Sequence, residues 1–187
     1  IVLRHSERLG RLLNDLTDLS NIELGKVGLR REPVRVDEVV ASVVGIIAPR
    51  AARSRVAVTA QVPADLPEVS ADRDRLAQVL INLVDNAVKY TPEGGSVSLT
   101  ARRPDEHAIE MAVTDTGIGI PPADLPRITE RFYRVDRARS RELGGTGLGL
   151  AIVKHLVMAH GGELGIESEP GRGTTVRFTL PIEPPAA

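Results

Sequence analysis

The order in which helical and strand-like apolar patterns follow each other limits the folds open to this chain. Helical spacing covers residues 34–52, with an end expected near Pro49, and residues 72–90 and 147–159. Strand-like alternation lies between these helices, partly as hairpins, and no regular strand–helix–strand repeat is present. This order predicts an α+β fold, a two-layer sandwich in which a mixed, mostly antiparallel sheet packs against three helices.

The strands are expected in short alternating segments that are bounded by Gly, Pro or Asp. They cover residues 55–61, 96–102, 108–114, 163–168 and 174–180. Residues 117–149 form a long irregular connection with a helical patch near residues 124–132. Long loops in compact domains are usually functional, so this segment is a candidate part of a site.

The first 24 residues carry a separate helical pattern. A seam with spacings of three and four, as in a coiled coil, consists of Val2, His5, Leu9, Leu12, Leu16 and Leu19. One such helix cannot bury its seam alone, so we expect a partner helix. Residues 25–33 are expected to be a linker, because Gly25 and Gly28 disfavour a helix. Since the chain starts without Met, we expect it to be a piece of a longer protein.

Composition excludes several kinds of site. The chain has no cysteine, so disulfides and thiolate metal sites are excluded. A net charge of -1 and an aromatic content of 2% give no support for nucleic-acid binding. No apolar run reaches the roughly 20 residues that a membrane-spanning helix needs.

Two asparagines lie on one face of the helix predicted over residues 72–90. Asn82 and Asn86 are four residues apart, and Lys89 follows one turn later. Carboxamide oxygens are suitable ligands for Mg²⁺, and the lysine would then meet a phosphate. Taken alone, the same residues also fit a solvated polar face without a ligand.

Asp115, Thr116 and Gly117 follow a predicted strand, and a second glycine follows at Gly119. A carboxylate at a strand end can accept a hydrogen bond from an adenine amino group, and glycines let the backbone approach a ligand. An Asx turn without a ligand is the simple alternative. Asp-Thr-Gly is also the signature of aspartic proteases, but one copy would require a homodimer and an all-β fold.

A glycine-rich segment, residues 144–150, leads into the last helix. Glycines and backbone amides at the start of a helix form an anion site. No Gly-Lys-Ser/Thr follows, so the segment is not a P-loop, and alone it is a weak motif. Arginines at positions 131–141 precede it and suit phosphate oxygens, although a solvated surface patch is the alternative.

In this order, the motifs resemble those of the catalytic and ATP-binding domain of sensor histidine kinases, within the gyrase/Hsp90/histidine-kinase/MutL superfamily. The likeness runs from about His5 to Pro181. Five segments resemble the N, G1, F and G2 boxes and the last small box of the family: residues 78–90, 115–120, 130–134, 145–150 and 173–174. The resemblance implies a sandwich of the Bergerat type, preceded by one long N-terminal helix.

The resemblance implies a site for ATP and Mg²⁺, in which one set of residues binds the ion and the phosphates. Asn86, helped by Asn82, is expected to hold the ion. Lys89 is expected to contact the phosphates, and Arg134 and Arg139 to reach them from the connection that closes over the nucleotide.

For the rest of the nucleotide, the resemblance implies that Asp115 binds the adenine amino group, with Thr174 beside it through water. Tyr90 is expected to pack near the nucleotide. Backbone contacts are expected at Gly117, Gly119, Gly145, Gly147, Leu148 and Gly149.

Asn82 also bears on the reaction, since related ATPases carry a glutamate there as the general base for water. An amide cannot accept a proton at neutral pH, so we expect slow hydrolysis and donation of the phosphoryl group to another side chain. The alternatives are a slow ATPase or an anti-sigma-type serine kinase of the same superfamily, and a scaffold that dimerises without nucleotide.

The resemblance implies three parts: residues 1–30, the second helix of the dimerisation and histidine-phosphotransfer hairpin; residues 31–183, the ATP-binding domain; and residues 184–187, a tail. In the family, the acceptor histidine is followed by an acidic residue and, a little later, a proline. No such stretch is present, so the acceptor is expected outside this chain, and His5, on the helical seam, is expected to be a packed residue of the helical bundle. The implied partners are the histidine-bearing hairpin of the parent protein and the receiver domain of a response regulator. In this two-component scheme the parent is a homodimer anchored in the inner membrane, with this part in the cytoplasm.

Four single residues carry further expectations. His107, His155 and His160 are expected to be structural or solvated. Thr129 stands where the family usually has the first phenylalanine of the F box, which predicts weaker packing of the connection that closes over the nucleotide.

Overall fold

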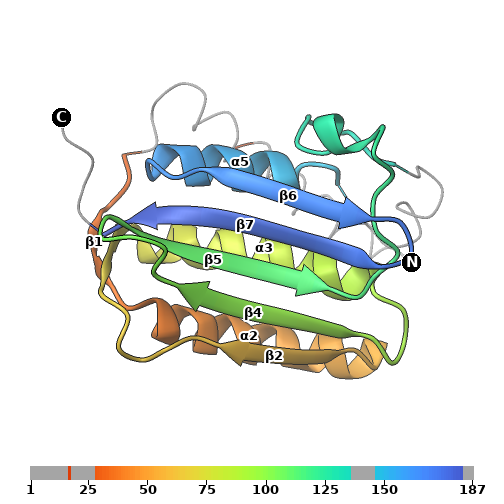
Figure 1. Ribbon diagram of the computed structural model, residues 1–187, viewed down its shortest axis with the longest axis horizontal. Coiled ribbons are helices and arrows are strands. Elements are labelled where there is room, and N and C mark those ends of the chain that lie inside the picture. Colours follow the sequence, from red (N-terminus) through yellow and green to blue (C-terminus); the bar gives the residue numbers. More distant parts are fainter. Residues whose placement is uncertain (1–16, 18–27, 136–145, 183–187) are drawn as a thin grey trace.

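The computed structural model describes residue 17 and residues 28–135 and 146–182. These residues form a five-stranded sheet with three helices on one face, so the predicted two-layer α+β architecture is confirmed (Figure 1). The helix expected over residues 1–24, its seam and the tail after residue 183 lie outside the described residues. Within the described part, no helix is both long and apolar enough to cross a bilayer.

The five-stranded sheet has the order β2-β4-β5-β7-β6. The strands are β2 (Ala57–Gln61), β4 (Ser96–Arg102), β5 (Ala108–Asp115), β6 (Leu164–Glu169) and β7 (Gly173–Pro181). β2 runs parallel to β4, and the other neighbouring pairs of this sheet are antiparallel. The register pairs Asp115 with Thr174, so the sheet brings two predicted site residues together at one end.

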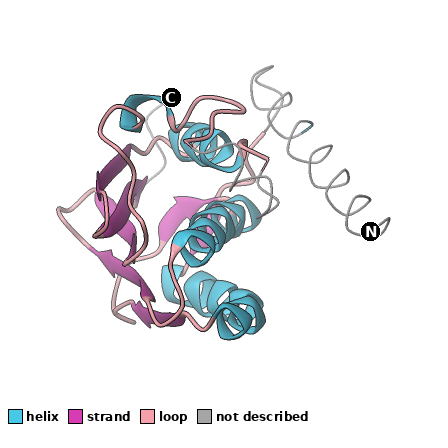
Figure 2. Ribbon diagram, turned by 90° about the vertical axis from the view of Figure 1, so that its right-hand side faces the viewer, coloured by secondary structure: helices cyan, strands magenta, loops and turns pink. Residues whose placement is uncertain are grey.

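Three helices cover one face of the sheet in the order α2, α3, α5 (Figure 2). They are α2 (Val36–Ser54), α3 (Arg73–Tyr90) and α5 (Gly149–Ala159). α3 starts at Asp72, whose side chain accepts hydrogen bonds from the amides of Asp74 and Arg75, as an N-cap does. The predicted apolar stripe of α3 is confirmed, since its members are buried: Leu76, Val79, Leu80, Leu83, Val84 and Ala87.

Two short strands were not predicted. β1 (Glu32–Val34) and β3 (Val69–Ala71) form a separate antiparallel sheet, in which Pro33 pairs with Ser70. The predicted linker over residues 25–33 and the helix start at Val34 are therefore wrong at these positions. Three residues are too few to show a period, and the pairing joins segments that are far apart in the sequence.

The predicted end of α2 near Pro49 is also wrong. Pro49 lies inside the helix, which continues to Ser54. A proline removes one backbone hydrogen bond and usually disrupts a helix. Here Ile47 and Ala51, on either side of it, are buried in the core, and this packing overrides the local preference.

Two smaller bounds differ from the prediction. The helical patch expected near residues 124–132 is a single 3₁₀ turn, η1 (Leu125–Arg127), and α5 begins at Gly149 and not at Gly147. Gly147 has a φ of +77°, which is incompatible with a right-handed helix.

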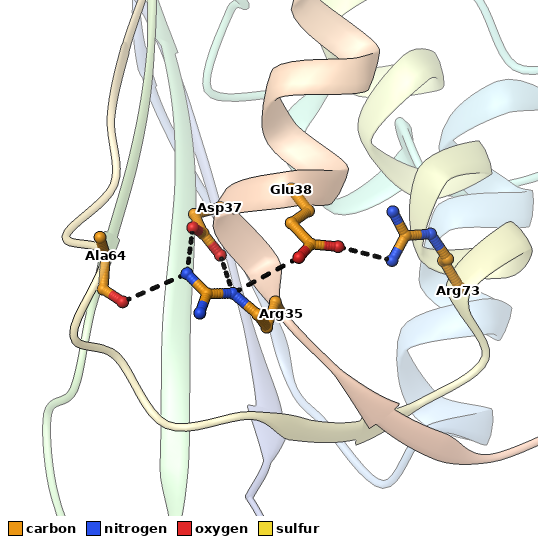
Figure 3. A network of polar contacts seen from close by, with 5 residues as sticks. All are labelled: Arg35, Asp37, Glu38, Ala64 and Arg73. Carbon is orange, nitrogen blue, oxygen red and sulfur yellow. Dashed lines mark hydrogen bonds and ion pairs between the residues drawn. The ribbon is translucent and has the colours of Figure 1, made fainter.

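The starts of α2 and α3 are joined by a chain of ion pairs (Figure 3). Arg35 pairs with Asp37 and Glu38, and it also donates a hydrogen bond to the carbonyl oxygen of Ala64. Glu38 in turn lies 3.1 Å from Arg73, the first residue of α3. These charges are exposed and contribute little stability, but they show that the two helices start side by side.

The segment that precedes β1 is tied to the start of α3 and the end of α5. The amide of Arg30 donates to Asp72 Oδ2 at 3.0 Å. The Arg31 guanidinium donates to the carbonyl oxygens of Ala159 and His160, at 2.8 Å and 3.2 Å. A cation at the C-terminus of a helix complements its unpaired carbonyls and its dipole.

Candidate functional site

The carboxamide face of α3 lines a cavity of about 440 Å³. Asn82, Asn86 and Lys89 all border this cavity, as their spacing predicts. Lys89 Nζ lies 4.8 Å from the centre of the Tyr90 ring, and Tyr90 lines the cavity too. The polar face of α3 therefore meets a hollow and not open solvent, which argues against the solvated-face alternative.

Asp115, the last residue of β5, contributes a carboxylate to the same cavity. Its Oδ1 accepts hydrogen bonds from the amides of Gly117, at 2.8 Å, and Thr174, at 3.2 Å. Burial raises the pKa of the Asp115 carboxyl above its usual range, and these two hydrogen bonds oppose the rise. Because both amides bind Oδ1, Oδ2 is the oxygen left to accept from a ligand.

Glycine is required in the turn after Asp115. A Cβ at Gly117 would lie 2.6 Å from Asp115 Oδ1 and 2.7 Å from the carbonyl oxygen of Tyr90. A Cβ at Gly119, where φ is +69°, would lie 2.1 Å from the carbonyl oxygen of Glu169. The turn therefore packs closely against α3 and against the turn between β6 and β7.

Side chains and backbone of the β6–β7 hairpin hold this turn in place. The amide of Ile120 donates to Ser168 Oγ at 2.8 Å, and the amide of Gly171 donates to the carbonyl oxygen of Ile118 at 2.8 Å. Ser168 Oγ also lies 2.8 Å from Thr174 Oγ1. The Asp115 end of the cavity is thus a fixed, hydrogen-bonded structure.

The glycine-rich start of α5 faces the two asparagines. A Cβ at Gly149 would lie 3.6 Å from Asn82 Oδ1 and 3.7 Å from Asn86 Nδ2. Gly147 accepts a hydrogen bond from the amide of Phe132 at 2.9 Å, and Leu148, the N-cap residue, is fully buried. The N-terminal end of α5 is therefore brought to the carboxamide face of α3, where its amides suit an anion.

Most of the predicted site residues border this one cavity. Those that line it are Asn82, Asn86, Lys89, Tyr90, Asp115, Gly119, Arg134, Gly147, Gly149 and Thr174. Gly117 and Leu148 support its walls without lining it. Arg139 and Gly145 lie outside the described residues, so their expected contacts stay predictions.

Two charged residues of the cavity were missed by the sequence reading. Arg50 of α2 and Asp85 of α3 both line it, and they form an ion pair with each other. Arg50 carried no motif, and it reaches the cavity only because α2 runs past Pro49. The apolar part of the lining was also missed and includes Ile118, Ile120, Ile128 and Val176.

The segment that leads into residues 136–145 is anchored by Tyr133, which lines the cavity. Its hydroxyl donates to Asp124, and the Arg127 guanidinium lies 4.3 Å from the centre of its ring. Phe132 is 59% exposed. Its φ of +60° is unusual for a bulky residue and marks a sharp change of chain direction.

The expected structural role of His160 is confirmed. It is buried, its Nδ1 lies 2.7 Å from the carbonyl oxygen of Leu156, and its Nε2 accepts from the amide of Asp72 at 3.0 Å. Nδ1 therefore carries the proton and donates to Leu156. Burial lowers the pKa of His160 below its usual range, which is the direction that favours this neutral ring. His155 is half-buried and His107 is exposed, and both lie outside the cavity lining, whereas His5 is outside the described residues.

No cluster of three or more His, Cys, Asp or Glu that could hold a metal ion occurs among the described residues. The oxygen donors of the cavity include the amides of Asn82 and Asn86, whereas the carboxylate of Asp85 is paired with Arg50 and that of Asp115 accepts from backbone amides. A metal bound here would need further oxygens from a ligand. This set fits a hard ion such as Mg²⁺, which keeps waters and phosphates.

The comparisons with known proteins agree with this geometry. Residues 71–184 match the family described as histidine kinase-, DNA gyrase B-, and HSP90-like ATPase. Sensor histidine kinase WalK of Bacillus subtilis is 40% identical over 184 residues, which are 98% of this chain and 30% of that protein. The sensor-like histidine kinase SenX3 of Mycolicibacterium smegmatis is 40% identical over 187 residues, which cover 98% of this chain and 47% of that protein.

A solved structure also matches this chain. Full-length ShkA in complex with AMPPNP matches with a TM-score of 0.86 at 36% identity, over 100% of this chain and 38% of that chain. This chain thus spans less than half of the length of each of these three relatives. The mixed sheet under three helices also excludes the all-β aspartic-protease alternative for Asp115. The chain belongs to the histidine kinase-, DNA gyrase B- and HSP90-like ATPase family, and it carries an ATP-binding catalytic domain of the sensor histidine kinase type.

Proposed function

We propose that this domain binds Mg-ATP in the described cavity and donates the γ-phosphoryl group to a histidine on a dimerisation hairpin of its parent protein. The observation that carries the proposal is that Asn86 and Asp115 line one cavity although they come from a helix and from a strand end. A carboxylate acceptor, a carboxamide face and a glycine-rich helix start border one space, as a purine triphosphate with its ion requires.

The residue roles in this proposal follow the chemistry of each group. Asp115 accepts from the adenine amino group, with Thr174 beside it through water, and Tyr90 packs near the nucleotide. Asn86, helped by Asn82, holds Mg²⁺, which neutralises charge on the phosphates when it is bound.

The phosphate end uses cations and backbone amides. Lys89, Arg134 and Arg139 contact the phosphates from α3 and from the connection before α5, and the amides near Gly147 and Gly149 bind phosphate oxygens. These groups mostly position and neutralise, which is what phosphoryl transfer requires from a protein.

Transfer to histidine is favoured over hydrolysis by the amide at Asn82. An amide cannot take a proton from water at neutral pH, so the site lacks a base at this position. The parent protein would pass the phosphoryl group on to a receiver domain of a response regulator. It would act as a homodimer anchored in the inner membrane, with residues 1–30 as the second helix of the hairpin and the catalytic domain in the cytoplasm.

Calorimetry and a transfer assay together test the proposal. The chain should bind AMPPNP more tightly with Mg²⁺ than without it. With γ-labelled ATP and a histidine-bearing hairpin supplied in trans, it should label the hairpin on a group that is labile in acid and stable in alkali.

A matched control variant and the results expected for the alternative functions complete the test. Asn86→Ala should abolish labelling, whereas Gln78→Ala, which removes an amide from the same helix outside the cavity lining, should not. Acid-stable label would favour a serine kinase, and phosphate release without transfer a slow ATPase. Absence of binding at millimolar nucleotide would favour a scaffold and refute the proposal.

A further inference from the structure

Arg50 and Asp85 form an ion pair at the rim of the cavity, and the residue roles proposed above do not use it. Arg50 Nη1 contacts Asp85 Oδ1, and both side chains line the cavity together with Asn82 and Lys89. The side chains are 35% and 31% exposed, so the guanidinium is neither buried nor fully solvated. Such a cation can exchange one partner for another at small cost.

The two helices hold Arg50 at this place. Glu38 of α2 pairs with Arg73 of α3 near the starts of the helices, and Arg50 pairs with Asp85 nearer to their ends. The same number of residues, twelve, separates Glu38 from Arg50 and Arg73 from Asp85. The helices therefore run parallel and in register, and about three turns of each carry the second pair to the cavity.

Asp85 is the unexpected member of the pair. It lies three residues after Asn82 and four residues before Lys89, on the edge of the helix face that we assign to the phosphates. An unpaired carboxylate there would repel a triphosphate. Arg50 compensates this charge, and its planar fork can also bind phosphate oxygens in pairs.

We propose that Arg50 is a further phosphate-binding residue, which Asp85 holds at the rim until a nucleotide arrives. The terminal phosphate then takes over the guanidinium from Asp85, so the site favours nucleotides with more phosphates. Asp85 acts as a positioning residue that competes with the ligand. The inference rests on the proposed binding of Mg-ATP in this cavity.

Binding of Mg-AMPPNP, Mg-ADP and adenosine to the full 187-residue chain tests this role by calorimetry. Arg50→Gln should weaken AMPPNP about tenfold, ADP less and adenosine less than about twofold. Asp85→Asn should strengthen AMPPNP about threefold and leave adenosine unchanged. Arg50→Lys, which keeps the charge without the fork, should fall between Arg50→Gln and the wild type.

Two control variants separate charge from helix packing. Arg53→Gln removes a cation from the same helix outside the cavity lining, and Glu38→Gln breaks the other ion pair between α2 and α3. Neither should change AMPPNP affinity by more than about twofold. Thermal unfolding of every variant should stay close to that of the wild type.

The sign of the effects decides the outcome. Opposite signs for Arg50→Gln and Asp85→Asn, confined to phosphate-bearing ligands, support the proposal. The proposal is overturned if both variants change the AMPPNP affinity in the same direction, if they change adenosine affinity equally, or if neither has an effect. A purely structural ion pair would give the same effect whichever of its two residues is replaced. Wild-type chain that binds no AMPPNP would refute the proposed function itself, and that result differs from normal binding with unresponsive variants.

Discussion

Asp115→Asn changes one atom in the cavity and separates recognition of the adenine from stability of the fold. The asparagine Oδ1 can still accept from the amides of Gly117 and Thr174, as the carboxylate does at 2.8 Å and 3.2 Å. The second oxygen becomes an NH₂ group, which is a donor where the adenine amino group also donates. The variant therefore loses a charge-assisted hydrogen bond and sets two donors against each other.

The loss can be estimated from these two effects. A hydrogen bond to a charged group contributes about 1.5–3 kcal/mol, and an unmatched donor adds to the loss, so we expect about 2–4 kcal/mol. This corresponds to a roughly 30- to 1000-fold increase in the Kd for Mg-AMPPNP. Calorimetry measures it directly, and Asp105→Asn is the matched control. The Asp105 carboxylate also accepts two backbone hydrogen bonds, from His107 and Ala108, but it is exposed and outside the cavity lining.

The same variant should keep its stability. Burial raises the pKa of Asp115 in the fold above its value in the unfolded chain. The stability that this group contributes therefore falls as the pH rises from the unfolded pKa, about 3.9, through the higher folded pKa. A neutral amide removes this dependence, so Asp115→Asn should unfold at neutral pH no more easily than the wild type. Wild-type affinity for AMPPNP in a folded Asp115→Asn variant would refute the adenine assignment.

Three further predictions concern the supports of the site and are measured by denaturant or thermal unfolding. Gly119→Ala should lower the free energy of unfolding by about 3 kcal/mol or more, because φ is +69° and its Cβ would overlap the carbonyl oxygen of Glu169 at the end of β6. Gly171→Ala, with a φ of +78° and open space around the Cβ, should cost only about 1–2 kcal/mol; equal costs would contradict the overlap. The pKa of His160 is lowered in the fold, so its contribution to stability is complete above the unfolded pKa, about 6.5, and is lost as the pH falls toward the folded pKa. His160→Gln should flatten this loss, and an unchanged pH profile would contradict it. Arg31→Ala should destabilise by about 1–2 kcal/mol through lost hydrogen bonds to the end of α5, whereas Arg30→Ala, which keeps its bonded backbone amide, should be nearly neutral; similar losses would contradict this capping role.

The elements whose periodic apolar pattern extends over many residues could be predicted from the sequence. The buried stripe of α3 and the alternation in β4 give repeated, independent signals of one face, so the layers and most strand bounds are confirmed. The short strands β1 and β3 could not be predicted, because pairing between distant segments, and not local preference, creates them. The helix end predicted near Pro49 is wrong for a related reason, since burial of Ala51 in the core overrides the local preference of a helix breaker.

Some residues of the candidate site could likewise be predicted from the sequence, and others could not. Asn86 and Asp115 stood out because their residue types are unusual beside an apolar stripe and after a strand. Arg50 and the aliphatic lining could not be found, since an arginine or isoleucine in an amphipathic segment has no distinctive signal. Their place in the cavity depends on how α2 and the turn after Asp115 pack against α3.

An NMR titration of the ¹⁵N-labelled chain tests the central claim, that one ligand reaches both Asn86 and Asp115. The side-chain amide of Asn86 reports on one region of the cavity, and the backbone amides of Gly117 and Thr174 report on the Asp115 carboxylate. With Mg-AMPPNP, all three signals should shift with a single midpoint, whereas adenosine should shift mainly the last two. Separate midpoints for Asn86 and for the two backbone amides, or a silent Asn86, would contradict the account.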